Sequence, residues 1–109
     1  MKSLYTEKRL CDQIVQYLNF QGNYVWRTNT GSIKTEKGHM VHMARKGTSD
    51  ILGLTKTGRF VAIEVKKPET RKNVTVYQQM FLDEIKRYGG IAGVATSPEE
   101  ALSIIEGKI

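Results

Sequence analysis

The sequence predicts a mixed α/β fold in which helices pack against one central sheet of parallel and antiparallel strands. Three observations predict it. Helical periodicity occurs near the start, in the middle and at the end of the chain. Short runs rich in β-branched and aromatic residues lie between these segments, and Gly or Pro punctuates them. The expected element order is α-β-β-β-α-β-α, and 109 residues suit a single domain covering 1–109.

The first helix is expected from Ser3, as its N-cap, to about Phe20, with Gly22 just beyond its end. One face of this helix carries residues at three- and four-residue spacing: Leu4, Glu7, Cys11, Ile14 and Leu18. Glu7 is the charged member of this otherwise apolar stripe, and a charge on a buried face is costly without a partner. Cys11 is the single cysteine, so it can form no disulfide within the chain and is expected to be buried.

Residues 24–29 favour a strand, and residues 30–48 are expected to form a long basic loop with a short extended piece at 39–43. The basic side chains of this loop are Lys34, Lys37, Arg45 and Lys46. They are the best candidates for contacts with phosphates, although a solvated loop would have the same composition. His39 and His42 lack the further ligands that a zinc site requires and are expected to be solvated.

Two strands at residues 50–55 and 59–66 are separated by Lys56-Thr57-Gly58, which predicts a hairpin. A helix from about Thr75 to Tyr88 follows, closed by two glycines.

Residues 91–95 are small and apolar, as in a buried strand. The last helix is expected to open at Ser97 as N-cap, with Pro98 in the first position and Glu100 completing a capping box.

The amino-acid composition limits the classes of function that this protein can have. The chain has 17 Lys and Arg against 11 Asp and Glu, a net charge of +6, of which residues 1–49 contribute +5. Such an excess favours a polyanionic partner, although it also serves solubility. No apolar run reaches about 18 residues and no signal-peptide core occurs, so we expect a soluble, cytoplasmic protein without membrane contact.

The strand around residues 60–66 carries residues that could take part in catalysis or metal binding. Side chains alternate along a strand, so Glu64 and Lys66 lie on the same face. If the hairpin loop has three residues, Asp50 lies directly across from Glu64, whereas a loop of two residues would put Asp50 on the other face. Two carboxylates at that distance repel each other unless a divalent cation lies between them, and hard oxygen ligands suit Mg²⁺ or Mn²⁺.

Each of these residues also has a structural interpretation. Glu64 and Lys66 could form a salt bridge on an exposed strand. Glu7 could be a carboxylate that favours the start of a helix. Gln78 shares a helix face with apolar residues, which turns its amide inward, but it could also face solvent at the start of that helix.

Three segments together resemble a known family: Gly47-Thr48-Ser49-Asp50, Ile63-Glu64-Val65-Lys66, and Gln78 ahead of an amphipathic helix. They resemble the VRR-NUC domain, a branch of the PD-(D/E)XK nucleases, over nearly the whole chain. The resemblance implies a restriction-endonuclease-like core. Ser49 departs from the pattern, because the family usually has Pro before this Asp.

The resemblance implies Mg²⁺- or Mn²⁺-dependent hydrolysis of phosphodiester bonds in DNA. Asp50, Glu64 and the backbone carbonyl of Val65 would bind the metal, with Glu7 reaching it directly or through water. Lys66 would position the attacking water and offset charge on the phosphate. Gln78 would orient Lys66 or the phosphate.

We therefore expect an endonuclease that cuts four-way or other branched DNA as a homodimer, because two symmetric nicks need two sites related by a two-fold axis. Two alternatives remain open. One is a restriction-like or nicking nuclease acting on linear duplex or single strands. The other is a DNA-binding module of the same fold without catalysis. A small nuclease of this kind also suits a phage or prophage acting in its host cell.

Overall fold

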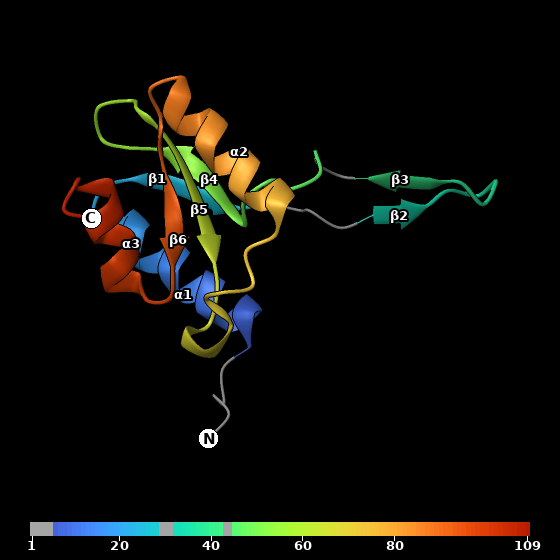
Figure 1. Cartoon of the computed structure of the whole chain (residues 1–109), viewed down its shortest axis with the longest axis horizontal. Helices are drawn as coiled ribbons and strands as arrows, with labels where there is room; N and C mark the ends of the chain where they lie inside the picture. Colours follow the sequence, from blue (N-terminus) through green and yellow to red (C-terminus); the bar gives the residue numbers. More distant parts are fainter. Residues whose placement is uncertain (1–5, 29–31, 43–44) are drawn as a thin grey trace.

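The computed structural model describes residues 6–28, 32–42 and 45–109. Its centre is a four-stranded mixed sheet with strand order β1-β4-β5-β6, and a separate pair of strands, β2 and β3, lies beside it. Three α-helices pack on the four-stranded sheet. In Figure 1, α2 lies on one side of this sheet and α1 and α3 lie on the other. The expected class, a mixed α/β fold with helices against a mixed sheet, is confirmed at this level.

Helix α1 spans Glu7–Phe20, and the hydroxyl of Thr6 accepts a hydrogen bond from the Arg9 backbone N–H. Thr6 is therefore the N-cap, and the expected start at Ser3 is wrong because the helix begins four residues later. Ser3 and Leu4 themselves lie outside the described residues. The face of α1 that packs on the sheet consists of Leu10, Cys11, Ile14 and Leu18.

Strand β1 (Tyr24–Arg27) pairs antiparallel with β4 (Ile51–Leu54), and β4 pairs antiparallel with β5 (Phe60–Val65). Strand β6 (Ile91–Ala95) lies parallel to β5. Alternate residues of β5 point to opposite faces of the sheet. Val61, Ile63 and Val65 pack with α1 and with helix α3 (Pro98–Ile105), whereas Ala62 packs with Leu82 of helix α2 (Val76–Arg87). Strand β5 is therefore covered on both faces.

The expected loop at residues 30–48 contains two short strands, so the order α-β-β-β-α-β-α omitted them. Strand β2 (Ser32–Lys34) pairs with β3 (Met40–His42), which falls within the extended piece expected at 39–43. Figure 1 shows this hairpin extending away from the four-stranded sheet. Three residues per strand are too few for a clear alternation of apolar and polar side chains, so the pattern gave no signal.

After β5, the 3₁₀ turn η1 (Pro68–Thr70) leads to helix α2 (Val76–Arg87). Helix α3 (Pro98–Ile105) closes the fold, with Ser97 as its N-cap. The expected capping box at this helix is wrong. The Glu100 carboxylate reaches past Ser97 and accepts hydrogen bonds from the backbone N–H and the hydroxyl of Thr96, at 2.6 and 3.0 Å.

No helix within the described parts of the chain combines the length and apolar character that crossing a bilayer requires.

Gly53 determines how closely β1 approaches β4. A methyl group at Gly53 would lie 2.5 Å from the Cα of Val25 and would also overlap the carbonyl oxygen of Tyr24. Both are backbone atoms of the paired strand, so neither can rotate away. We expect Gly53→Ala to lower the free energy of unfolding by about 1–3 kcal/mol. Chemical denaturation measures the loss. The exposed Gln16→Ala on α1 is the control and should change stability by less than about 0.5 kcal/mol, whereas equal stabilities for the two variants would contradict the close approach.

Candidate active site

Asp50 and Glu64 meet where strands β4 and β5 come together. The hairpin has the three-residue loop that this arrangement requires: the Thr55 N–H donates to the Arg59 carbonyl at 2.8 Å, and Ile51 pairs with Ile63. One position further along the same register, Asp50 lies across from Glu64. Oδ2 of Asp50 also accepts a hydrogen bond from the Val65 N–H at 2.8 Å. The expected juxtaposition of the two acids on adjacent strands is therefore present.

Thr28 holds the segment that carries Asp50. Its backbone N–H donates to the Asp50 carbonyl at 2.8 Å, and its hydroxyl donates to the Ser49 carbonyl at 2.7 Å. Ser49 is fully buried, and its Oγ has no partner in the described part of the structure. The sequence did not point to Thr28. Its only signal is that it directly follows β1, the strand paired with β4.

Glu64 is a buried acid whose surroundings disfavour its charged form. It is 2% exposed, and its Oε2 is buried without a hydrogen-bond partner among the described residues. The pKa of Glu64 is raised to about 9, mainly by burial and then by the hydrogen bond and negative charge of Asp50. At neutral pH without a metal ion, Glu64 therefore keeps a proton beside the Asp50 carboxylate.

Lys66 lies on the same face of the chain as Glu64, directly after β5. It is 8% exposed, and its positive charge opposes the rise in the pKa of Glu64. None of the salt bridges in the described parts of the chain involves Lys66. Burial of both Glu64 and Lys66 excludes the alternative of a salt bridge on an exposed strand. The amine is thus close to the acids without being bound to one of them.

Glu7 approaches the site from the first turn of α1. It is half-buried, and its Oε2 accepts a hydrogen bond from the Thr70 hydroxyl in η1 at 3.1 Å. The negative charge of Glu7 makes a small contribution to the raised pKa of Glu64. Over residues 6–28, 32–42 and 45–109, no three His, Cys, Asp or Glu side chains are close enough to hold one metal ion together.

Gln78 was expected to orient Lys66 or the phosphate, and among the described residues it makes no hydrogen bond to Lys66. Its Oε1 accepts a hydrogen bond from the Thr75 N–H at 2.9 Å, and its own N–H donates to the Thr75 hydroxyl at 3.1 Å. These two bonds form a capping box at the start of α2. The side chain is half-buried, but it is hydrogen-bonded to the helix terminus and not to Lys66.

The four basic candidates are spread over two places. Lys37 is exposed in the turn of the β2–β3 hairpin, and the side chain of Lys34 lies outside the described residues. Arg45 and Lys46 are exposed beside α2, where Nζ of Lys46 lies 4.0 Å from the centre of the Tyr77 ring. His39 is exposed, as expected, and the side chain of His42 lies outside the described residues.

A small cavity of about 200 Å³ opens beside the acids and is lined by Glu7, Lys8, Cys11, Arg27, Thr28 and Asp50. Burial, followed by the charge of Asp50, raises the pKa of the Cys11 thiol to about 12. The thiol therefore stays protonated and is unsuited to nucleophilic chemistry, in agreement with its expected role as a buried apolar side chain.

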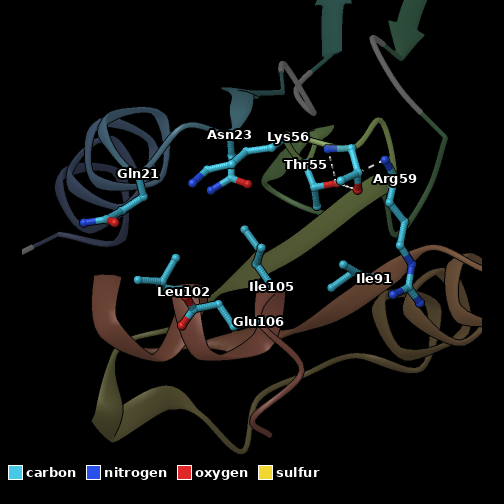
Figure 2. A pocket seen from close by; sticks show the side chains of 10 residues that line it. Gln21, Asn23, Thr55, Lys56, Arg59, Ile91, Leu102, Ile105 and Glu106 are labelled. Atoms are coloured by element: carbon cyan, nitrogen blue, oxygen red, sulfur yellow. Dashed lines mark hydrogen bonds between the residues drawn. The ribbon is translucent and has the colours of Figure 1, made fainter.

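A second cavity, of about 280 Å³, lies around the turn between β4 and β5, at the opposite end of these strands from Asp50 and Glu64. Figure 2 shows Gln21, Lys56, Ile105 and Glu106 around it, contributed by separate parts of the chain. The described residues lining it include one carboxylate, Glu106, which pairs with Lys108 at 3.2 Å. This cavity therefore lacks the pair of acids that distinguishes the candidate site.

The residues at the acidic pair fit a divalent cation. Glu64 offers a buried oxygen without a partner among the described residues, and Asp50 supplies a second carboxylate, which the Val65 N–H binds. The carbonyl of Val65, the residue after Glu64, is the expected third oxygen donor. All of these donors are hard oxygens, which Mg²⁺ and Mn²⁺ prefer.

The raised pKa of Glu64 makes the stability of the metal-free protein depend on pH. Between pH 4.5 and about 9 the folded state holds a proton that the unfolded state releases, so stability falls as pH rises through this window. Below the window the effect is absent. Glu64→Gln should remove it and exceed the wild type in stability at pH 9, by a few kcal/mol in order of magnitude. Denaturation curves in the presence of a chelator measure this difference. The exposed Glu36→Gln should keep the wild-type pH profile, and a Glu64→Gln profile parallel to that of the wild type would contradict the buried proton.

Comparison with known proteins assigns no family to this chain. It matches no family model and no curated protein. The function of the site is therefore inferred from its residues and their geometry.

Proposed function

We propose that this chain is a metal-dependent, structure-specific DNA endonuclease whose sheet and helices form a restriction-endonuclease-like core similar to that of VRR-NUC domains. Asp50 and Glu64, brought together by the β4–β5 register with one carboxylate oxygen left without a partner, carry the proposal. A purely structural acid would be expected to have its buried oxygens hydrogen-bonded, because an unsatisfied buried group is costly.

Asp50, Glu64 and the Val65 carbonyl would hold Mg²⁺ or Mn²⁺, with Glu7 contributing through water. When bound, the ion supplies positive charge at the scissile phosphate and increases the acidity of water there. Glu64 would hold the ion as a carboxylate, with its proton released to solvent, because a cation would offset the repulsion between the two acids.

Lys66 would act on the reacting phosphate. Its amine is nearly buried and is not bound in a salt bridge with a described carboxylate, so it remains able to donate hydrogen bonds. A fixed cation in such a water-poor site offsets the charge that develops on phosphate oxygens. The same amine can donate a hydrogen bond that holds the attacking water in place. The contacts of Gln78 support a role in stabilising the start of α2, so we do not assign it a step in the reaction.

The proposed substrate is DNA, and branched or four-way DNA is favoured, cut by a homodimer. The net charge of +6 and the exposed Lys37, Arg45 and Lys46 support a polyanionic partner. Cutting of linear duplex or single strands, and DNA binding without catalysis, are the competing possibilities.

Replacing Lys66 or Glu64 by Ala should reduce DNA cleavage by about 100-fold or more, because each removes a charged group from the reacting centre. Thermal unfolding checks that each variant is folded at the assay temperature, and the exposed Lys72→Ala should cleave like the wild type. Cleavage is measured with Mg²⁺ or Mn²⁺ on a four-way junction, a flap, a fork, a duplex and a single strand of matched sequence. Light scattering of the DNA complex measures the oligomeric state. Full activity in either alanine variant would remove that residue from the mechanism, and a pure monomer on the junction would contradict the homodimer.

Thr70 should influence metal binding through its hydrogen bond to Glu7. Thr70→Val removes the hydroxyl that holds Glu7 and should weaken Mn²⁺ binding about 10-fold, as for other residues that orient a metal ligand. Thr70→Ser keeps the hydroxyl and should bind Mn²⁺ like the wild type. Isothermal calorimetry measures both affinities without DNA. Equal affinities for the valine variant and the wild type would show that Glu7 does not serve the metal.

A further inference from the structure

A groove lined by aromatic rings and cations runs along α2. Its volume is about 580 Å³, and its lining includes Arg45, Lys46, Tyr77, Met80, Phe81 and Tyr88. Three of these apolar side chains are strongly exposed: Tyr77 at 50%, Met80 at 57% and Tyr88 at 82%. A row of exposed apolar side chains on one helix is typical of a surface that binds something.

Gly47 fixes one wall of this groove. It has a φ of +85° and lies against the first turn of α2, where a Cβ would come within 2.5 Å of the Tyr77 carbonyl carbon. This close approach places the preceding Lys46 beside the Tyr77 ring, 4.0 Å from its centre. The groove therefore combines an aromatic surface with an amine close to it.

The charges of the groove favour an anionic occupant. Arg45 and Lys46 line it, whereas its carboxylate, Glu84, is paired with Arg87 at 3.4 Å. A second copy of this chain would bring the same cations toward each other and would carry a further +6. Aromatic rings next to cations are the combination on which nucleic-acid bases stack while their phosphates are neutralised.

The groove also lies close to the candidate active site. Lys46 and Asp50 are four positions apart in the sequence, so their Cα atoms are at most about 14 Å apart. This upper limit corresponds to about four steps along one strand of B-form DNA. A base in the groove would therefore belong to the same stretch of DNA as the phosphate at the acids.

We propose that this groove binds an unpaired nucleobase close to the cleaved phosphate, with the base stacked on Tyr77 and its phosphate against Lys46 and Arg45. A base within an intact duplex has both faces covered by its neighbours, so only an unstacked base can occupy the groove. Branch points and single-stranded ends provide such bases at low cost, whereas a continuous duplex does not. This inference rests on the proposed function and deepens it, because it makes the groove the element that distinguishes branched from linear DNA.

The test is equilibrium DNA binding in the presence of a chelator, so that binding is measured without cleavage. The probes are a fluorescein-labelled fork and a duplex of the same sequence. Tyr77→Ala should weaken fork binding by about 5-fold or more, the range expected for one stacked base, and should leave duplex binding unchanged. Tyr77→Phe keeps the ring and should bind the fork like the wild type. A 2-aminopurine base next to the branch point should be quenched by the wild type and not by Tyr77→Ala.

The control is Phe20→Ala, which removes an aromatic side chain that is 87% exposed at the end of α1, away from α2. It should bind both probes like the wild type. Tyr88→Ala is a second variant on the groove and should also weaken fork binding selectively.

Equal losses on fork and duplex, or no loss in Tyr77→Ala, would overturn the inference. A change from dimer to monomer in Tyr77→Ala, without a loss specific to the fork, would identify a second copy as the occupant and would also overturn it. A different pair of results would overturn the proposed nuclease function instead: fork binding that depends on Tyr77, and no cleavage of any DNA in Mn²⁺. Cleavage of DNA together with fork binding that does not depend on the Tyr77 ring would overturn only the inference about the groove.

Discussion

The register between β4 and β5 is the constraint on which the candidate site depends. A shift of one residue would turn Glu64 to the opposite face of the sheet and separate it from Asp50. The three-residue turn prevents that shift, because Gly58 adopts a φ of +86° there and Thr55 bonds to Arg59 across its base. The Val65 N–H then binds the Asp50 carboxylate at 2.8 Å, so a strand backbone positions the acid directly. The central position of β5, covered on both faces, keeps this geometry in a water-poor environment.

That environment creates the electrostatic conflict that a cation would resolve. Two carboxylates face each other where burial disfavours charge, and the pKa of Glu64 rises to about 9 mainly for that reason. The protein tolerates the conflict by keeping a proton on Glu64 at neutral pH. Such an arrangement stabilises nothing on its own, since a buried acid without partners for all its oxygens lowers stability. Under the proposed function, a divalent ion would offset this cost by taking the place of the proton on Glu64.

Contacts from distant parts of the chain support the site. Thr70 holds Glu7 from η1, and the next residue, Arg71, binds both oxygens of Glu100 in α3 at 2.7 and 2.8 Å. Burial works against ionisation of Glu100, yet the hydrogen bonds from Thr96 and Arg71 lower the pKa of this carboxyl below its usual value. The Arg71–Glu100 pair thus links α3 to η1, the turn that contacts Glu7 through Thr70.

The sequence by itself determined the elements whose signals are local. The Thr75 cap and the glycines after Tyr88 bound α2, small apolar residues mark β6, and Gly58 sets the hairpin, because caps, turns and periodicity act over a few residues. The hairpin signal left the opposition of Asp50 and Glu64 dependent on a three-residue loop, and the folded structure decided that length through the Thr55–Arg59 hydrogen bond. Tertiary structure decided the rest. The contacts of Glu7 with Thr70 and of Glu100 with Arg71 could not be predicted, because a polar side chain takes whichever group folding brings near. Gln78 differs, since Thr75-x-x-Gln78 has the local spacing of a capping box and the sequence did carry that signal. Thr70 reaches Glu7 across 63 positions of chain, and no local pattern records a contact of that range.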